Sequence, residues 1–107
     1  MIQTTAQRLY ITNFPYIVRD YNCNVIYIED KDNSWGKYAY DSNGNQTKFE
    51  SSTGYWRKTI YGNNNKMLKY NDSKGVWVIS SYDENNDISK YEDSFGNYWE
   101  ITMGMAN

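Results

Sequence analysis

The chain has 107 residues, enough for one small domain or one short repeat array but not for two independent cores. Hydrophobic residues make up only 39%, and 12 tyrosines and 4 tryptophans supply much of that share, which excludes a thick aliphatic core and favours a sheet covered with aromatic rings. The net charge of -2 offers no basic stripe for nucleic acid, and a lone Cys23 excludes a disulfide within the chain, which favours the cytoplasm.

Residues 1–19 lack the pattern of the rest of the chain, and we expect them to form a capping segment. They predict two irregular strands, at 8–12 and 16–19, divided by Pro15, which has no N–H group to donate. The segment carries no signal-peptide pattern and no membrane span. We expect five apolar side chains of the segment to pack on the start of the sheet: Leu9, Ile11, Phe14, Ile17 and Val18.

Residues 20–103 divide without insertion or deletion into units of 21 residues. The units are 20–40, 41–61, 62–82 and 83–103, and residues 104–107 form a tail that we expect to be loose or a weak cover. A tyrosine closes each of the first three units, and a glycine column and a tryptophan column recur inside the units. The members of these columns are Tyr40, Tyr61, Tyr82, Gly54, Gly75, Gly96, Trp35, Trp56 and Trp77.

Each unit predicts one β-hairpin, because two β-prone stretches flank a loop that ends in Gly or Asn. The first strands are expected at 25–29, 46–50, 67–71 and 88–92, and the second strands at 35–40, 55–61, 76–82 and 97–102. Stretches rich in Asn, Asp and Gly join the units as further turns. The fold class is therefore all-β, an antiparallel meander of four tandem 21-residue β-hairpin repeats that form a twisted sheet, with a closed barrel as the alternative.

Strand alternation assigns side chains of the predicted sheet to two faces. Trp56, Lys58 and Ile60 share one face, whereas the other face carries Tyr55, Arg57, Thr59 and Tyr61. The third unit divides in the same way, with Trp77 and Ile79 on one face and Val76, Val78 and Tyr82 on the other. Neither face is cleanly polar, so the sequence does not single out a face that must be covered.

Residues 38–45 read Tyr-Ala-Tyr-Asp-Ser-Asn-Gly-Asn, which resembles the YD repeat, and the period agrees with that family. The full motif occurs once, and four units cannot enclose a toxin as long YD-repeat proteins do. Residues 90–99, Lys-Tyr-Glu-Asp-Ser-Phe-Gly-Asn-Tyr-Trp, are similar to short stand-alone arrays of phages and bacteria. This resemblance implies an inhibitor of host machinery, of the kind that anti-CRISPR proteins represent.

The residue types argue against catalysis. The chain has no His, which removes the commonest general base and metal ligand, and Cys23 has no clustered base to activate it. The acidic stretch 83–87 lacks the spacing of a calcium loop. We therefore expect a protein that is not an enzyme and that uses neither a metal nor another cofactor.

The best-supported hypothesis is an intracellular protein-binding module, specifically a phage-encoded inhibitor that occupies a host defence nuclease or effector by surface contact. Lysines and Arg57 gather in residues 48–82, next to an acidic stretch in 83–107, which would match a charged host protein. Direct nucleic-acid or membrane binding is not expected. The candidate partner-binding residues are Tyr55, Arg57, Lys58, Tyr61, Lys69, Tyr70, Asp83, Glu84 and Glu92.

Two alternatives stay open. The first is a carbohydrate-binding module in which tryptophan rings stack on sugars outside the cell, with Trp35, Trp56, Trp77 and Trp99 as its residues. The second concerns assembly, since an exposed edge strand could pair two copies into one sheet and give a homodimer.

Overall fold

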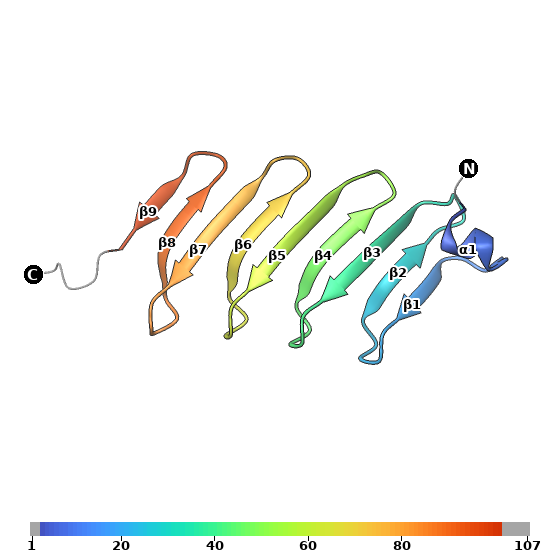
Figure 1. Cartoon of the computed structure of the whole chain (residues 1–107), viewed down its shortest axis with the longest axis horizontal. Coiled ribbons are helices and arrows are strands. Elements are labelled where there is room, and N and C mark those ends of the chain that lie inside the picture. The colour runs from blue at the N-terminus through green and yellow to red at the C-terminus, as the bar shows by residue number, and fades with distance from the viewer. Residues whose placement is uncertain (1–2, 102–107) are drawn as a thin grey trace, which may run out of the picture. The chain divides into compact units, whose positions relative to one another are not determined.

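A computed structural model describes residues 3–101, so the expected tail at 104–107 and the last residues of the fourth unit lie outside the described residues. The described strands follow one another in sequence order and pair antiparallel, which confirms the predicted all-β meander (Figure 1). Among the described residues, the strands of neither compact unit close into a barrel. The chain divides into two compact units, Met1–Trp56 and Arg57–Asn107, and we describe each by itself.

The first unit holds one short helix and four strands. Helix α1 covers Thr5–Arg8, and the strands are β1 (Tyr16–Arg19), β2 (Val25–Glu29), β3 (Trp35–Tyr40) and β4 (Gln46–Ser51). Strand β1 pairs with β2, β2 with β3, and β3 with β4, each time antiparallel. The predicted strands at 16–19, 25–29 and 35–40 agree with the structure, and the strand predicted at 46–50 is one residue longer.

The second unit continues the meander. Its strands are β5 (Trp56–Tyr61), which begins at the last residue of the first unit, β6 (Met67–Asp72), β7 (Trp77–Tyr82), β8 (Ile88–Asp93) and β9 (Tyr98–Glu100). Neighbours in sequence pair antiparallel from β5 to β9. Every described boundary lies within two residues of its predicted position, because the turn residues between strands are easy to recognise in the sequence.

The turns explain the period of the chain. The backbone N–H groups of Asp20, Asp41, Gly62 and Asp83 each donate to the carbonyl oxygen four residues later, at 2.9 Å in every case. These four donors stand 21 residues apart. The residue before each acceptor has a positive φ, as at Gly44 with φ 84°, which is the backbone region that Gly and Asn tolerate best.

Asp side chains lock several of these turns. The Asp41 carboxylate accepts hydrogen bonds from the backbone N–H groups of Asn43 and Asn45, both at 2.9 Å. The Asn45 N–H is the main cause that holds the pKa of Asp41 below its ordinary value. Asp83 repeats the arrangement, with the N–H groups of Asn85 and Asp87 as donors at 2.9 and 3.0 Å. An Asp at the first turn position therefore stabilises the bend whose geometry the positive-φ residue permits.

The strand predicted at 8–12 is wrong, because the N-terminal segment begins with α1 instead. Thr4 caps this helix: its Oγ1 accepts from the Gln7 N–H at 3.2 Å, and its own N–H donates to the Gln7 side chain at 2.9 Å. This reciprocal pair is a capping box, which satisfies N–H groups that a helix start otherwise leaves unpaired. Residues 9 and 10 then form a turn rather than a strand.

The predicted apolar cover is also only partly correct. Leu9 and Ile17 were expected to pack on the sheet, yet 50% of Leu9 and 39% of Ile17 is exposed. Ile11, Phe14 and Val18 are half-buried. The buried residue of the segment is Ala6, whose backbone N–H donates to the Glu29 carboxylate on β2 at 3.0 Å. The segment thus covers the start of the sheet by polar contacts of α1 and by pairing of β1, not by a set of large apolar side chains.

Neither unit contains a thick core. Among residues 3–101, the buried hydrophobic residues are Ala6 and Tyr27 alone. Aromatic rings instead pack on each other over the sheet: Tyr38 and Phe49 lie 5.0 Å apart between ring centroids in the first unit. This arrangement follows from the composition, since tyrosines bury their rings and keep their hydroxyls hydrated. Each unit therefore exposes side chains on both faces of its strands.

Candidate interaction surface

One face of the second unit carries a continuous row of side chains across five strands. The strand registers place Ile60 opposite Lys69, Lys69 opposite Ile79, Ile79 opposite Glu92, and Glu92 opposite Tyr98. Residues directly opposite each other in antiparallel strands point to the same face. We call these five residues the β5–β9 row, and Figure 1 shows the strands that bear it side by side.

The row leaves large apolar side chains open to solvent. Ile60 is 55% exposed, Ile79 is 38% exposed and Tyr98 is 57% exposed. The charged members between them are Lys69, which is exposed, and Glu92, which is half-buried. Apolar and charged residues therefore alternate along the row, with a lysine on one side of Ile79 and a glutamate on the other.

Side chains next to the row extend the same face. Lys58 lies opposite Asn71, and Asn71 lies opposite Trp77. Each of these residues is two positions along its strand from a member of the β5–β9 row and therefore points to the same face. The Trp77 backbone is held by Ser94, whose Oγ accepts from the Trp77 N–H at 3.0 Å. On the other side of the row, the Lys90 ammonium lies 6.0 Å from the centroid of the Tyr98 ring, which allows a cation–π contact.

The opposite face of the second unit uses its polar groups internally. The Tyr70 hydroxyl donates to the Asp72 carboxylate at 2.8 Å, and the Tyr91 hydroxyl donates to Asp93 at 2.7 Å. Burial alone would raise the pKa of Asp72, but the bonds from Tyr70 and from backbone N–H groups hold it below its ordinary value. The Asn97 amide is the main cause that lowers the pKa of Asp93, and the bond to Asp93 raises the pKa of Tyr91.

These contacts make the opposite face a structural surface. Its tyrosine hydroxyls donate hydrogen bonds to its carboxylates, which also accept from N–H groups of the turns. The Trp99 ring stacks on Tyr91 with centroids 6.1 Å apart. No buried side-chain polar atom in residues 3–101 lacks a hydrogen-bond partner. Large apolar side chains are exposed on both faces, since Leu68 and Trp99 of the opposite face are 36% and 40% exposed. The β5–β9 row differs in that it aligns apolar and charged side chains in one line across the strands, and we take it as the candidate for contact with another molecule.

The structure brings some of the predicted partner-binding residues together and separates others. Lys69 and Glu92 lie in the β5–β9 row, and Lys58 lies next to it. Arg57 and Tyr70 point to the opposite face, because Arg57 pairs with Asp72 and strand alternation separates both from Lys58 and Lys69.

The remaining predicted residues occupy turns and strand ends. Tyr55 belongs to the first unit, where its ring lies 6.2 Å from Phe49. Tyr61 is the last residue of β5, opposite Met67 at an irregularity of the register. Asp83 and Glu84 sit in the turn between β7 and β8, where the Asp83 carboxylate accepts backbone N–H groups.

The four tryptophans do not form one row. In the second unit, Trp77 lies on the face of the β5–β9 row, whereas Trp99 pairs with Tyr91 on the opposite face. In the first unit, Trp35 stacks on Tyr27 with centroids 6.4 Å apart, and the Lys37 ammonium lies 5.0 Å above the same indole. Trp56 is the first residue of β5.

Sequence reasoning placed Ile60 and Ile79 on the same strand faces as Lys58 and Trp77 but left them out of the candidate surface, and it also left out Tyr98. The signal that could have found them is the cross-strand register. Once both turns around a strand are fixed, the residues opposite Ile79 on its two neighbours follow from counting. The tyrosine and tryptophan columns group residues that occupy the same position in successive repeats, whereas the row groups residues that lie opposite one another on neighbouring strands.

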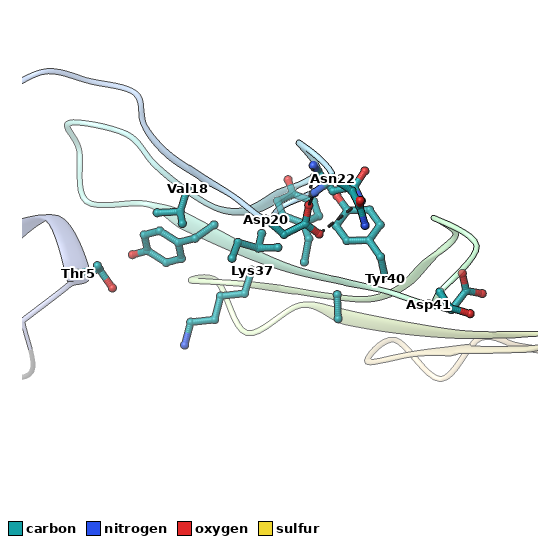
Figure 2. Close-up of a pocket in the computed structure, with 13 residues that line it drawn as sticks. Thr5, Val18, Asp20, Asn22, Lys37, Tyr40 and Asp41 are labelled. Carbon is teal, nitrogen blue, oxygen red and sulfur yellow. Dashed lines mark hydrogen bonds between the residues drawn. The ribbon is translucent and has the colours of Figure 1, made fainter.

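The first unit contains a groove of about 760 Å³ between its turns and strands (Figure 2). None of the predicted partner-binding residues lines it. Two of its polar groups form local hydrogen bonds: the Tyr40 hydroxyl donates to the Val25 carbonyl at 2.8 Å, and the Asp20 carboxylate accepts from the Asn22 N–H at 2.8 Å.

Two features of residues 3–101 bear on metal binding and on membrane insertion. No group of three or more His, Cys, Asp and Glu side chains there could hold a metal ion. The described part of the chain also contains no helix with the length and apolar character needed to span a membrane. The fold defines the chain as an antiparallel-meander protein, and the second unit carries a row of exposed apolar and charged side chains. No family model and no curated protein matches the chain.

Proposed function

We propose that the protein is a non-enzymatic binding module that contacts another protein through the β5–β9 row. The observation that supports this function is the exposure of Ile60, Ile79 and Tyr98 in one register-aligned row beside lysines. Burying an exposed Ile side chain contributes about 1.5–3 kcal/mol, so such a row can supply a small interface with its driving force. Lys58 and Lys90 would lie at the rim, where charge steers the partner and sets specificity.

A protein partner fits this face better than a carbohydrate does. Sugar binding by stacking calls for aromatic rings in one accessible line, yet Trp77 and Trp99 lie on opposite faces of the second unit. Protein contact surfaces instead combine apolar anchors with a polar surround, and the exposed Ile60, Ile79 and Tyr98 beside charged side chains fit that description.

In its narrower form, the proposal is a phage-encoded inhibitor that acts in the host cytoplasm on a defence nuclease or effector. The resemblance of residues 90–99 to short phage arrays supports this form, as do the lone Cys23 and the absence of His from the sequence. Inhibition would follow from occupation of the effector surface and would need no chemistry from this chain.

Capture of partners from bacterial lysates tests the role of the row. The tagged full-length chain, the Ile79→Ser and Ile60→Ser variants, and a Phe95→Ser control are compared. Phe95 is an exposed apolar residue in a turn outside the row, so its loss matches the change in surface character. We expect each row variant to capture at least about tenfold less partner than wild type does, because each loses one apolar anchor. Equal retention by Ile79→Ser and wild type would contradict the proposal.

The narrower form has its own assay. The chain is expressed in cells whose CRISPR–Cas system destroys an incoming plasmid, and transformants are counted. Inhibition would restore transformation with wild type and with Phe95→Ser, but not with Ile79→Ser. If none of the three proteins restores transformation while partner capture persists, the inhibitor proposal is contradicted and the broader proposal of a binding module is not.

A further inference from the structure

The β5–β9 row has a charge pattern that complements itself. Its members read apolar, positive, apolar, negative, apolar from Ile60 to Tyr98, and Ile79 on the central strand β7 is the midpoint. Lys69 stands one strand away from Ile79 in one direction, and Glu92 stands one strand away in the other. If a second copy of the row is laid on the first in reversed order, each charged position faces the opposite charge and each apolar position faces an apolar one.

We infer that a second copy of this chain docks on the β5–β9 row, face to face, about a two-fold axis that runs parallel to β7. This inference rests on the proposed function, since it names one partner of the same row. Rotation about that axis exchanges the two sides of the row. Lys69 of one copy then faces Glu92 of the second copy, and Ile60 faces Tyr98 of the second copy, while the two Ile79 side chains meet on the axis.

The charges select this axis over the other two-fold axis that lies in the interface. An axis along the row would bring Lys69 onto Lys69 of the second copy and Glu92 onto Glu92, and like charges in contact oppose association. The axis along β7 avoids both clashes and forms two opposite-charge pairs. It also brings Trp77 of the two copies close to each other, because Trp77 lies on β7 two residues from Ile79 on the same face.

The size of the face bounds the strength of the dimer. Five strands spaced about 4.8 Å apart, each about 10 to 20 Å long, give a patch about 20 Å across, and packed sheets lie about 10 Å apart. Such a patch is at or below the low end of the roughly 800 Å² per partner found in stable complexes. We therefore expect a reversible dimer whose population depends on protein concentration, which leaves the row accessible to a competing partner.

Sedimentation velocity of the full-length chain, from about 1 µM to about 1 mM, tests the inference. Wild type should shift from monomer to dimer across this range, and a wild-type monomer throughout would overturn the inference whatever the variants do. Lys69→Glu and Glu92→Lys should each weaken the dimer by at least about tenfold, because each places two pairs of like charges in contact. Lys31→Glu, in an exposed turn of the first unit, makes the same charge change outside the row and should dimerise as wild type does.

Two combinations test the facing pair directly. The double variant with Lys69→Glu and Glu92→Lys restores complementarity and should dimerise again. An equimolar mixture of the two single variants should form a heterodimer, since both charged facing pairs then join opposite charges and the other three facing pairs are apolar. Failure of both combinations to associate would overturn the Lys69–Glu92 pairing.

The outcomes separate this inference from the proposed function. A wild-type monomer that still captures a lysate protein through the row overturns the second copy as partner and leaves the binding module supported. Conversely, a dimer that Ile79→Ser dissociates, with lysate capture unchanged, supports the second copy and removes the row as the site for other proteins.

Discussion

Glu29 illustrates how a single residue can hold a segment in place. Its carboxylate is closed off from solvent on β2 and accepts three hydrogen bonds, from the Thr4 hydroxyl, the Ala6 N–H at 3.0 Å and the Tyr27 hydroxyl at 2.7 Å. Burial alone would raise the pKa of Glu29, but the three donors outweigh burial and hold the pKa below its ordinary value. The charged form therefore ties α1 to the sheet.

Replacing Glu29 with Gln should destabilise the chain by about 1–3 kcal/mol, the usual contribution of hydrogen bonds to a charged group. Urea unfolding at pH 7 measures this cost, with Glu84→Gln in an exposed turn as the control. The pKa of Glu29 is lowered by folding, so its stabilisation is fully present above the unfolded pKa of about 4.3, declines below that value and is lost as the pH falls through the lower folded pKa. The cost of the substitution should therefore shrink at pH 3, and a cost that is the same at both pH values would contradict this account.

The sequence could not reveal the role of Glu29. In the repeat it shares a column with Glu50, Asn71 and Glu92, and nothing local distinguishes it from those more accessible residues. Its partners Thr4 and Ala6 lie 25 and 23 residues away in a segment with no repeat pattern. Burial of one column member thus depends on a contact that periodicity does not encode.

At the scale of elements, the hairpins were predictable and the helix was not. Turns rich in Asp, Asn and Gly mark both ends of each strand, since these residues adopt the bends that other residues avoid. Helix α1 has four residues, which is too short for an apolar period, and it depends on the reciprocal bonds between Thr4 and Gln7. The Thr4–Gln7 capping box is easily overlooked in the sequence because residues 8–12, which follow it, resemble a short strand.

Gly75 offers a test of the turn geometry. Its φ is +84° and a Cβ there would meet no atom within 4 Å, so Gly75→Ala should cost only the backbone penalty of about 1–2 kcal/mol. Gly62→Ala is the matched control, since Gly62 is not in the left-handed region and its Cβ would make ordinary contact with Leu68 at 3.5 Å. Thermal unfolding should lower the midpoint for Gly75→Ala only. Equal effects at both positions would show that the left-handed backbone is not what constrains Gly75.

At the scale of the whole molecule, acid should weaken the fold. Five carboxylates of the described residues that accept internal hydrogen bonds have pKa values below their ordinary range: Glu29, Asp32, Asp41, Asp72 and Asp93. Each stabilises the folded chain above its unfolded pKa and loses that effect as the pH falls through its folded pKa. The free energy of unfolding should therefore be level from pH 7 to about 5 and decline below about 4. A free energy that holds constant down to pH 3 would contradict the role of these bonds.

The β5–β9 row was only partly predictable at this scale. The sequence identified Lys69 and Glu92 as candidates through the uneven spread of charge, and strand alternation assigned Ile60 and Ile79 to faces. The row itself joins residues from different repeat positions, because antiparallel neighbours run in opposite directions. Assembling it requires the register of each strand pair, and the irregular registers near Tyr61 and Tyr82 hide that register from simple counting.

The 21-residue recurrence of the turn hydrogen bonds has an evolutionary consequence. A gene segment that encodes one such unit can be duplicated in frame, and both ends of the copy would meet turns of the kind they already join. Each duplication would add one hairpin, about 10 Å of extra sheet. Unequal recombination would thus lengthen or shorten the sheet in fixed steps, so that selection can adjust the size of the protein through the number of units rather than through new folds.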